Sequence, residues 1–147
     1  MSFEREHSAG YLTNWAARLF ARSIDRRLKT LGVSSGQLPV FFALAGGRRM
    51  TQKQLAEAAA IEQPTMAATL ARMERDGLIQ RDTNPADGRS ALVALSPAAA
   101  RKARALREAI DAVNREALAE FTATDREALL AMLRKVISTL ESGRERS

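Results

Sequence analysis

The chain has 147 residues, of which 46% are hydrophobic, so it is long enough to bury a core and short enough to form one domain. Lys and Arg number 23 against 17 Asp and Glu, and the resulting net charge of +6 favours an acidic partner such as nucleic acid. The absence of cysteine excludes disulfides, thiolate catalysis and thiol-based oxidant sensing.

The sequence offers no sign of export or of membrane insertion. Its N-terminus does not join a basic segment to an apolar run, and no stretch approaches the ~18 consecutive apolar residues that a membrane span requires. We therefore expect a cytoplasmic protein without a membrane partner.

Catalytic groups are equally scarce. The single histidine, His7, lies in the N-terminal lead-in, and the sequence contains no phosphate-binding glycine loop and no metal-ligand spacing. We predict a protein that is not an enzyme, with no catalytic residue, no cofactor and no metal site.

Four helices are predicted in the first half of the chain. Apolar residues at three- and four-residue spacing predict a helix from about His7 to Leu31, which Gly32 ends. Ser34 with Gln37, and Thr51 with Gln54, have the spacing of capping boxes that open the second and third helices. The fourth helix, Thr65 to Asp76, follows Pro64 and ends at Gly77.

A hairpin and two long helices complete the predicted order. Two runs compatible with β-strands, Leu78–Arg81 and Ala91–Leu95, flank turn residues at 84–88. Ser96-Pro97 opens a helix that continues to about Phe121, and a third capping box, Thr124 with Glu127, opens the last helix. The predicted class is mainly α (α+β).

The third and fourth helices, joined by a turn at 59–62 and followed by the hairpin, have the plan of a helix-turn-helix. In that plan the second helix enters the major groove of DNA, so it needs a narrow polar face opposite its apolar one. Alanines keep this helix slim, and the residues predicted to contact DNA are Gln63, Pro64, Thr65, Ala68, Thr69 and Arg72. The alternative is an ordinary amphipathic helix with a solvated face.

The tip of the hairpin, residues 82–89, is long for a structural turn. An arginine on a projecting wing suits a narrow, electronegative minor groove, so Arg89 is predicted to bind there while Asp87 orients its guanidinium. A surface Asp–Arg pair of little energetic value is the alternative.

These motifs together resemble the MarR family of bacterial and archaeal regulators. The resemblance covers nearly the whole chain and is strongest in the run Ile61–Ile79, in Asp87-Gly88-Arg89-Ser90 and in Leu95-Ser96-Pro97. It implies one MarR-type domain over 1–147, in which residues 34–95 form a winged helix-turn-helix lobe and residues 1–31 with 96–142 form long dimerisation helices. It also implies a homodimer on a pseudo-palindromic promoter site and, in many members, an effector pocket for small aromatic or phenolic acids.

The terminal helices indicate self-association independently of the resemblance. Each carries an apolar stripe that one winged-helix core cannot cover, and pairing two copies would bury both stripes. Packing within one chain is the alternative. On the first helix, Trp15, Arg18 and Arg22 share one side, where they could bind an aromatic carboxylate, although a lone Trp on such a helix is usually a core residue.

The sequence therefore predicts a sequence-specific regulator of transcription that binds double-stranded DNA and acts as a repressor that responds to a ligand. A nucleoid-type architectural protein that binds DNA without an effector is the main alternative, and a winged helix used only for protein contacts is another. The slim helix and single wing arginine favour sequence reading, because architectural proteins rely more on lysine clusters and wedge residues.

Overall fold

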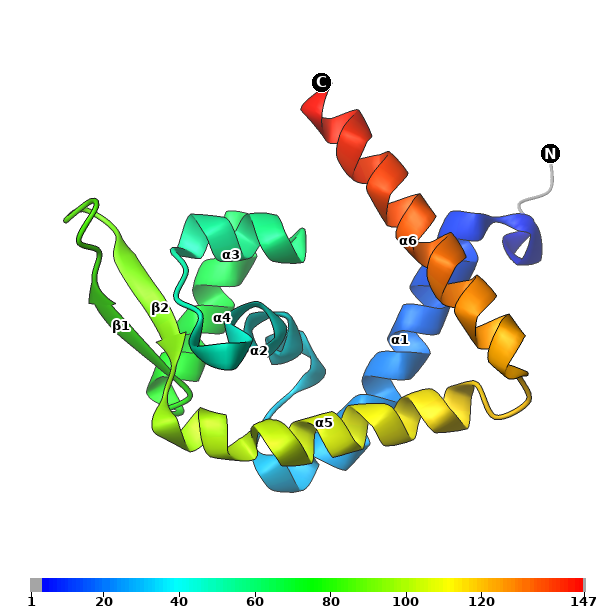
Figure 1. Cartoon of the computed structure of the whole chain (residues 1–147), viewed down its shortest axis with the longest axis horizontal. Coiled ribbons are helices and arrows are strands. Elements are labelled where there is room, and N and C mark those ends of the chain that lie inside the picture. The colour runs from blue at the N-terminus through cyan, green and yellow to red at the C-terminus, as the bar shows by residue number, and fades with distance from the viewer. Residues whose placement is uncertain (1–3, 147) are drawn as a thin grey trace. The chain divides into compact units, whose positions relative to one another are not determined.

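A computed structural model describes residues 4–146, so residues 1–3 of the predicted dimerisation segment and Ser147 lie outside the described residues. The described chain is mainly helical with one two-stranded antiparallel sheet, which confirms the predicted class (Figure 1). It forms two compact units that divide between Val113 and Asn114, and each is described here by itself.

The first unit begins with the long helix α1, Ala9–Leu28. A short 3₁₀ turn, Arg5–His7, precedes α1, and the Tyr11 N–H donates to the Ser8 hydroxyl at 3.2 Å, which caps the helix. A further 3₁₀ turn extends it to Leu31, and Gly32 follows with a left-handed φ of 67°. The predicted stop at this glycine is therefore confirmed.

The next three helices are α2, Leu38–Leu44, α3, Gln52–Ala59, and α4, Gln63–Arg75. The two capping boxes predicted for the second and third helices are present. The Ser34 box opens a 3₁₀ turn that leads into α2, and Thr51 and Gln54 exchange bonds of 2.9 and 3.2 Å at the start of α3. Helices α3 and α4 thus follow one another along the chain, as the helix-turn-helix plan requires.

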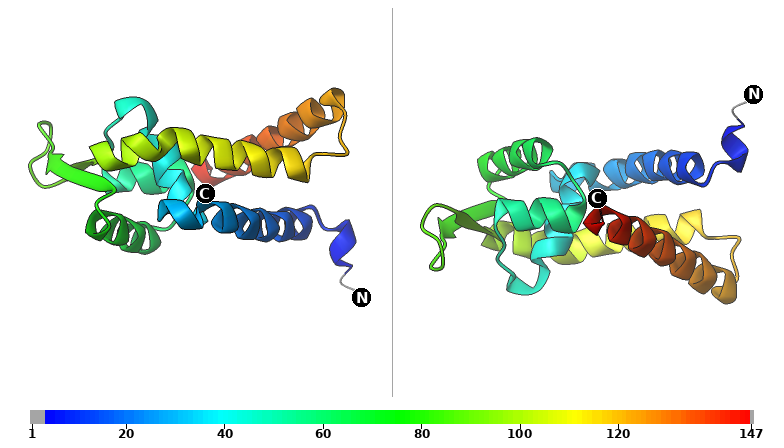
Figure 2. Two further views of the ribbon diagram at one scale, coloured as in Figure 1. Left: turned by 90° about the horizontal axis from the view of Figure 1, so that it is seen from below. Right: turned by 90° about the horizontal axis from the view of Figure 1, so that it is seen from above.

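The hairpin consists of β1, Ile79–Thr83, and β2, Ala91–Leu95, paired from Ile79↔Leu95 to Thr83↔Ala91. Met50, just before α3, bridges to Val93 with bonds of 3.1 and 2.7 Å, so β2 lies between Met50 and β1. Within the first unit the hairpin lies at one end and the start of α1 at the other (Figure 2).

The core of the first unit joins the helices to the base of the hairpin. Its most deeply buried side chains come from α1, α2, α3, α4 and β2: Leu28, Val40, Leu44, Leu55, Met66, Leu70, Met73 and Val93. The helix α5, Pro97–Ala117, begins beside this core. The Ser96 hydroxyl accepts from the Ala99 N–H and donates to the Gly77 carbonyl at 2.6 Å, which ties the start of α5 to the end of α4.

The second unit consists mainly of α6, Ala123–Glu145. The predicted cap at Thr124 is wrong, because Thr122 is the extended residue and its hydroxyl accepts the Asp125 N–H at 3.1 Å. Two overlapping capping boxes occur in this sequence, and the earlier one gives two more helical residues. None of the α6 side chains that the structure describes is buried.

Candidate nucleic-acid interface

Helix α4 has one buried face and one exposed face. Met66, Leu70 and Met73 are fully buried, and their spacing of four and three residues places them on the same side of the helix. The opposite side presents the exposed predicted residues Gln63, Pro64, Thr65, Ala68 and Arg72. Because small side chains lie between Thr65 and Arg72, this face is narrow enough to approach base edges in a major groove.

Thr69 does not belong to that exposed face, contrary to the sequence prediction. Its side chain is only 6% exposed, and its hydroxyl donates to the Thr65 carbonyl at 3.0 Å. This bond back to the preceding turn satisfies the hydroxyl, so the small side chain can pack inside. Thr69 thus supports the helix from within and is removed from the set of proposed DNA contacts.

The turn between α3 and α4 depends on an unusual backbone conformation at Ala60. This residue has φ 53° and ψ 42°, the left-handed region that glycine adopts most easily. The Ala60 N–H donates to the Glu57 carbonyl at 3.2 Å, and the Ile61 N–H donates to the Ala56 carbonyl at 3.0 Å. These bonds end α3 sharply and let α4 start at Gln63.

The tip of the wing, residues 84–90, is held by its own hydrogen bonds. The Asn84 side chain accepts from the Ala86 N–H at 3.0 Å and donates to the Ser90 hydroxyl at 3.1 Å. The Ser90 N–H donates to the Asp87 carbonyl at 3.2 Å. An ordered tip presents Arg89 from a fixed backbone, which reduces the conformational entropy lost on binding.

Asp87 contributes to this order in a different way from the prediction. Its carboxylate accepts the backbone N–H of Arg89 at 2.9 Å, whereas we predicted a bond to the guanidinium. Among residues 4–146, the guanidinium groups of Arg72 and Arg89 make no ion pair, and both side chains are exposed. Both guanidinium groups are thus available to bind an anionic partner.

Two ion pairs of β1 were not predicted from the sequence, and β1 extends to Thr83, so Asp82 lies on the strand and not in the predicted tip. Arg81 Nε lies 2.6 Å from Glu74 Oε2 and joins β1 to α4, and Arg49 pairs with Asp82 of the same strand. The partners of the second pair are 33 residues apart in sequence, so no local pattern reveals it. Only the fold brings these side chains together.

The predicted effector residues lie at the start of α1. Trp15 is half-buried and meets Tyr11 edge-on, with ring centroids 6.4 Å apart. The Arg5 guanidinium lies 4.2 Å from the Trp15 ring centroid, and that of Arg18 lies 5.9 Å from the Tyr11 ring. Both contacts have the geometry of cation–π interactions.

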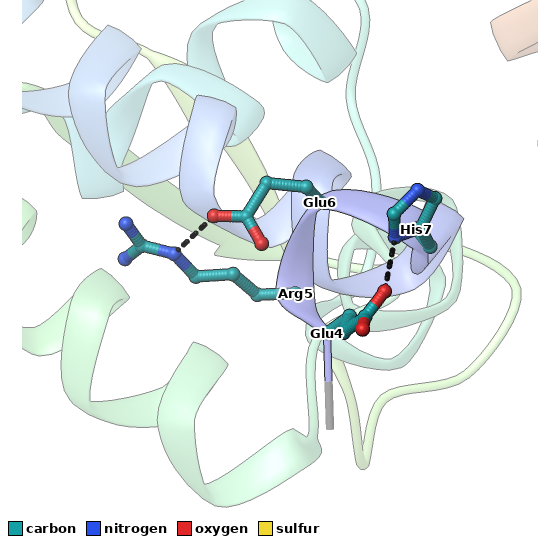
Figure 3. Close-up of polar contacts among 4 residues, drawn as sticks. All are labelled: Glu4, Arg5, Glu6 and His7. Carbon is teal, nitrogen blue, oxygen red and sulfur yellow. Dashed lines mark hydrogen bonds and ion pairs between the residues drawn. The ribbon is translucent and has the colours of Figure 1, made fainter. Parts of the chain in front are cut away.

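The turn that supplies Arg5 contains two side-chain contacts of its own. Figure 3 shows Arg5 Nε bonded to Glu6 Oε1 and His7 Nδ1 bonded to Glu4 Oε2, each at 2.9 Å. His7 is thus engaged with a carboxylate at the surface. Across residues 4–146 there is no group of three His, Cys, Asp or Glu side chains that could hold a metal ion, and no helix long and apolar enough to cross a membrane.

Comparison with known proteins identifies the class. A family model described as the MarR family matches residues 31–90. An uncharacterized HTH-type transcriptional regulator of Bacillus subtilis, YwoH, is 31% identical over 134 residues, covering 91% of this chain and 96% of the relative. The crystal structure of a probable transcriptional regulator from Pseudomonas aeruginosa is 28% identical with a TM-score of 0.81, covering 90% of this chain and 99% of that chain.

Two more distant structures share the fold. A mutant of MarR from E. coli, complexed with operator DNA, has a TM-score of 0.79 at 22% identity and covers 86% of this chain and 91% of that one. The PcaV regulator from Streptomyces coelicolor, in complex with its natural ligand, has a TM-score of 0.78 at 23% identity and covers 94% and 97%.

The helix-turn-helix and its projecting hairpin define a winged-helix DNA-binding protein. The family-model match narrows this class, and together with a regulator 31% identical along 91% of the chain it shows that the chain belongs to the MarR family of transcriptional regulators. Its relatives are thus regulators of transcription, in agreement with the function expected from the sequence.

Proposed function

We propose that this protein is a sequence-specific repressor that binds a pseudo-palindromic promoter site as a cytoplasmic homodimer and is released by a ligand. The observation that carries the proposal is the narrow exposed face of α4, which ends in the unpaired cation Arg72 and stands in the same unit as the wing residue Arg89. A dimer that occupies a promoter excludes polymerase by its bulk alone, and this favours repression over activation.

In this proposal α4 enters the major groove. Gln63 and Thr65 hydrogen-bond to bases or phosphates near the helix N-terminus, where the dipole also favours phosphate. Pro64 shapes the first turn, and Ala68 leaves room for base edges. Arg72 contacts a guanine edge or a phosphate.

The wing binds the adjacent minor groove through Arg89, and Asp87 keeps the tip folded through the Arg89 backbone. Two-fold symmetry would place the two copies of α4 roughly 34 Å apart, one turn of the duplex. Residues 34–95 act as the reading lobe in this proposal, and residues 1–31 with 96–142 act as the dimerisation helices.

Arg72→Ala and Arg89→Ala test these assignments. A duplex selected by the wild-type protein from a random-sequence pool serves as the specific site, and a scrambled duplex of equal length measures non-specific binding. We expect each variant to lose about 1 to 3 kcal/mol of binding to the selected duplex, the value of a base-edge contact. Fluorescence anisotropy at fixed salt measures both affinities, because salt alone changes them strongly.

The same titrations separate the proposal from the other functions. Equal wild-type affinity for both duplexes would favour an architectural protein, and no affinity for either would favour a winged helix that binds only proteins. As a matched control, Arg104→Ala removes the same charge from α5, away from α4 and the wing. An Arg104→Ala variant that loses as much discrimination would contradict the site assignment.

The effector is proposed to be a small aromatic or phenolic acid that contacts Trp15 and Arg18. The aromatic pair and the nearby guanidinium groups support this chemistry, because they offer a ring to stack on and a cation for a carboxylate. Trp15 is the only tryptophan, so a panel of aromatic acids can be screened by its fluorescence. Unchanged emission and unchanged thermal stability across the panel would exclude the site.

A further inference from the structure

The wing is attached to the rest of the reading lobe by two ion pairs that leave β1 in opposite directions. Successive side chains of a strand point to opposite faces of the sheet, so Arg81 and Asp82 leave β1 on different sides. Arg81 reaches Glu74 near the end of α4, and Asp82 reaches Arg49, just before the Met50 bridge. The hairpin is thus held from both faces near its base.

This arrangement matters because the hairpin is supported unevenly: β2 is buried or half-buried throughout and is bridged at Val93 to Met50, whereas most of β1 is exposed. Val93 is fully buried and Ile79 is 3% exposed, but the β1 residues from Gln80 to Thr83 are all exposed. A two-stranded hairpin depends on packing against other elements for its stability, so contacts along the exposed strand help to restrain it. The tip that carries Arg89 lies beyond Thr83, so a small tilt at the base displaces Arg89 relative to α4 (Figure 1).

We infer that the Glu74–Arg81 and Arg49–Asp82 ion pairs fix the tilt of the wing against α4, and that Glu74 and Asp82 are positioning residues for sequence-specific DNA binding. The inference rests on the proposed function, since it concerns the spacing between the groove-binding helix and the wing. Neither carboxylate touches DNA in this account. Each acts through its ion pair: Glu74 holds Arg81 of β1, and Asp82 ties β1 to Arg49.

The direction in which affinity for the selected duplex changes when a carboxylate is removed distinguishes a positioning role from a simple effect of charge. A carboxylate on a surface that faces DNA repels phosphates, so its removal strengthens binding to any duplex if charge alone matters. If the carboxylate positions the wing, its removal weakens binding to the selected duplex and leaves non-specific binding equal or stronger. Charge alone leaves the ratio of specific to non-specific affinity unchanged, whereas positioning lowers that ratio.

The test uses Glu74→Gln and Asp82→Asn in the full chain, with the selected and scrambled duplexes described above. We expect each variant to lower the ratio of specific to non-specific affinity by about tenfold, the order of one lost base-edge contact. Exposed ion pairs add little to stability, so both variants are expected to fold, and thermal unfolding checks this. An unchanged or higher ratio in both variants would overturn the inference.

The double variant Glu74→Gln/Arg81→Gln gives a second, independent readout. Two independent charge effects cancel, because the substitutions remove one charge of each sign, and the double variant then binds like the wild type. A positioning pair behaves as one unit, so the double variant keeps the tenfold loss of the single one. Return of the wild-type ratio would count against positioning.

Glu108→Gln is the matched control. Glu108 pairs with Arg104 at 2.9 Å on α5, so the substitution removes the same charge from an ion pair outside the wing. We expect no change in the ratio, and an equal loss here would overturn the inference. If wild type discriminates between the two duplexes and Arg72→Ala lowers that discrimination, only the inference is at stake. If wild type fails to discriminate, the inference and the proposed function fall together.

Discussion

At the scale of single residues, Ala60 has a backbone conformation that is unfavourable for a residue with a side chain. It is the one non-glycine residue among 4–146 with a positive φ, and its side chain is exposed, so nothing in the core requires a methyl group there. A left-handed conformation costs a non-glycine residue roughly 1–2 kcal/mol, and glycine avoids this cost but loses about 0.5–1 kcal/mol through the greater freedom of the unfolded chain. In an Ala60→Gly variant, the conformational strain that is relieved is therefore larger than the stability lost to the entropy of the unfolded chain.

We therefore expect Ala60→Gly to raise the free energy of unfolding by about 0.5 to 1 kcal/mol. Urea unfolding followed by circular dichroism measures the change. Ala58→Gly is the matched control, because Ala58 is also exposed but lies within α3, where glycine costs about 1 kcal/mol. An equal decrease in the free energy of unfolding in both variants would show that the backbone at Ala60 is not strained.

The residues that reasoning from sequence placed wrongly have short polar side chains. The small polar side chain of Thr69 predicts a place on the polar face of the helix, but its hydroxyl is satisfied by the Thr65 carbonyl and the side chain is buried. Asp87 was paired with the wrong part of Arg89 for a similar reason, since a short carboxylate finds a backbone N–H two residues away before it finds a side chain. Whether a short polar side chain bonds to nearby backbone or to another side chain depends on local geometry, which residue type and spacing do not specify.

At the scale of elements, capping boxes and glycine stops predicted the helices well. The boxes at Ser34 and Thr51 and the stops at Gly32 and Gly77 all hold, because they depend on residues within one turn. The ion pairs Arg49–Asp82 and Glu74–Arg81 could not be predicted in this way. Glu74–Arg81 joins α4 to β1, and Arg49–Asp82 joins the segment before α3 to β1, so the partners become neighbours only in the folded lobe.

The start of α6 offers a direct test of which cap operates. Replacing Thr122 by Ala removes the hydroxyl that accepts the Asp125 N–H, and we expect a loss of about 1 kcal/mol in the stability of α6. Thr124→Ala serves as the control, because Thr124 lies inside the helix and alanine is a better helix former. Amide hydrogen exchange over 123–130 reports the fraying directly, and faster exchange in Thr124→Ala than in Thr122→Ala would reverse the assignment.

At the scale of the whole molecule, the most informative feature is the apolar surface that the single chain leaves open. On α6 the exposed side chains recur at spacings of three and four residues along one stripe, which consists of Leu130, Leu133, Val136, Ile137 and Leu140. Leu12 and Leu19 of α1 are also more than 40% exposed. A contiguous apolar stripe of this length is uncommon on a monomer, so it supports the proposal that a second copy covers it.

Ile137→Glu tests the dimer and its link to DNA binding together. Ile137 is 55% exposed in the single chain, and burial of such a side chain contributes about 1.5–3 kcal/mol, counted twice in a two-fold interface. A carboxylate in its place forfeits this gain, and we expect a monomer in analytical ultracentrifugation at concentrations where the wild type is dimeric. Ser138→Glu adds the same charge at the next position, which faces away from the stripe, and is expected to remain dimeric.

The two variants also distinguish cooperation between half-sites from independent binding. A monomer presents one copy of α4 and one wing, so it loses the gain in effective concentration that joins two half-sites. Ile137→Glu is therefore expected to bind the selected duplex at least a hundredfold more weakly than Ser138→Glu, a difference of about 2.7 kcal/mol. If Ile137→Glu sediments as a dimer, or binds as a monomer with undiminished affinity, the apolar stripe has another role and one subunit suffices to read the site.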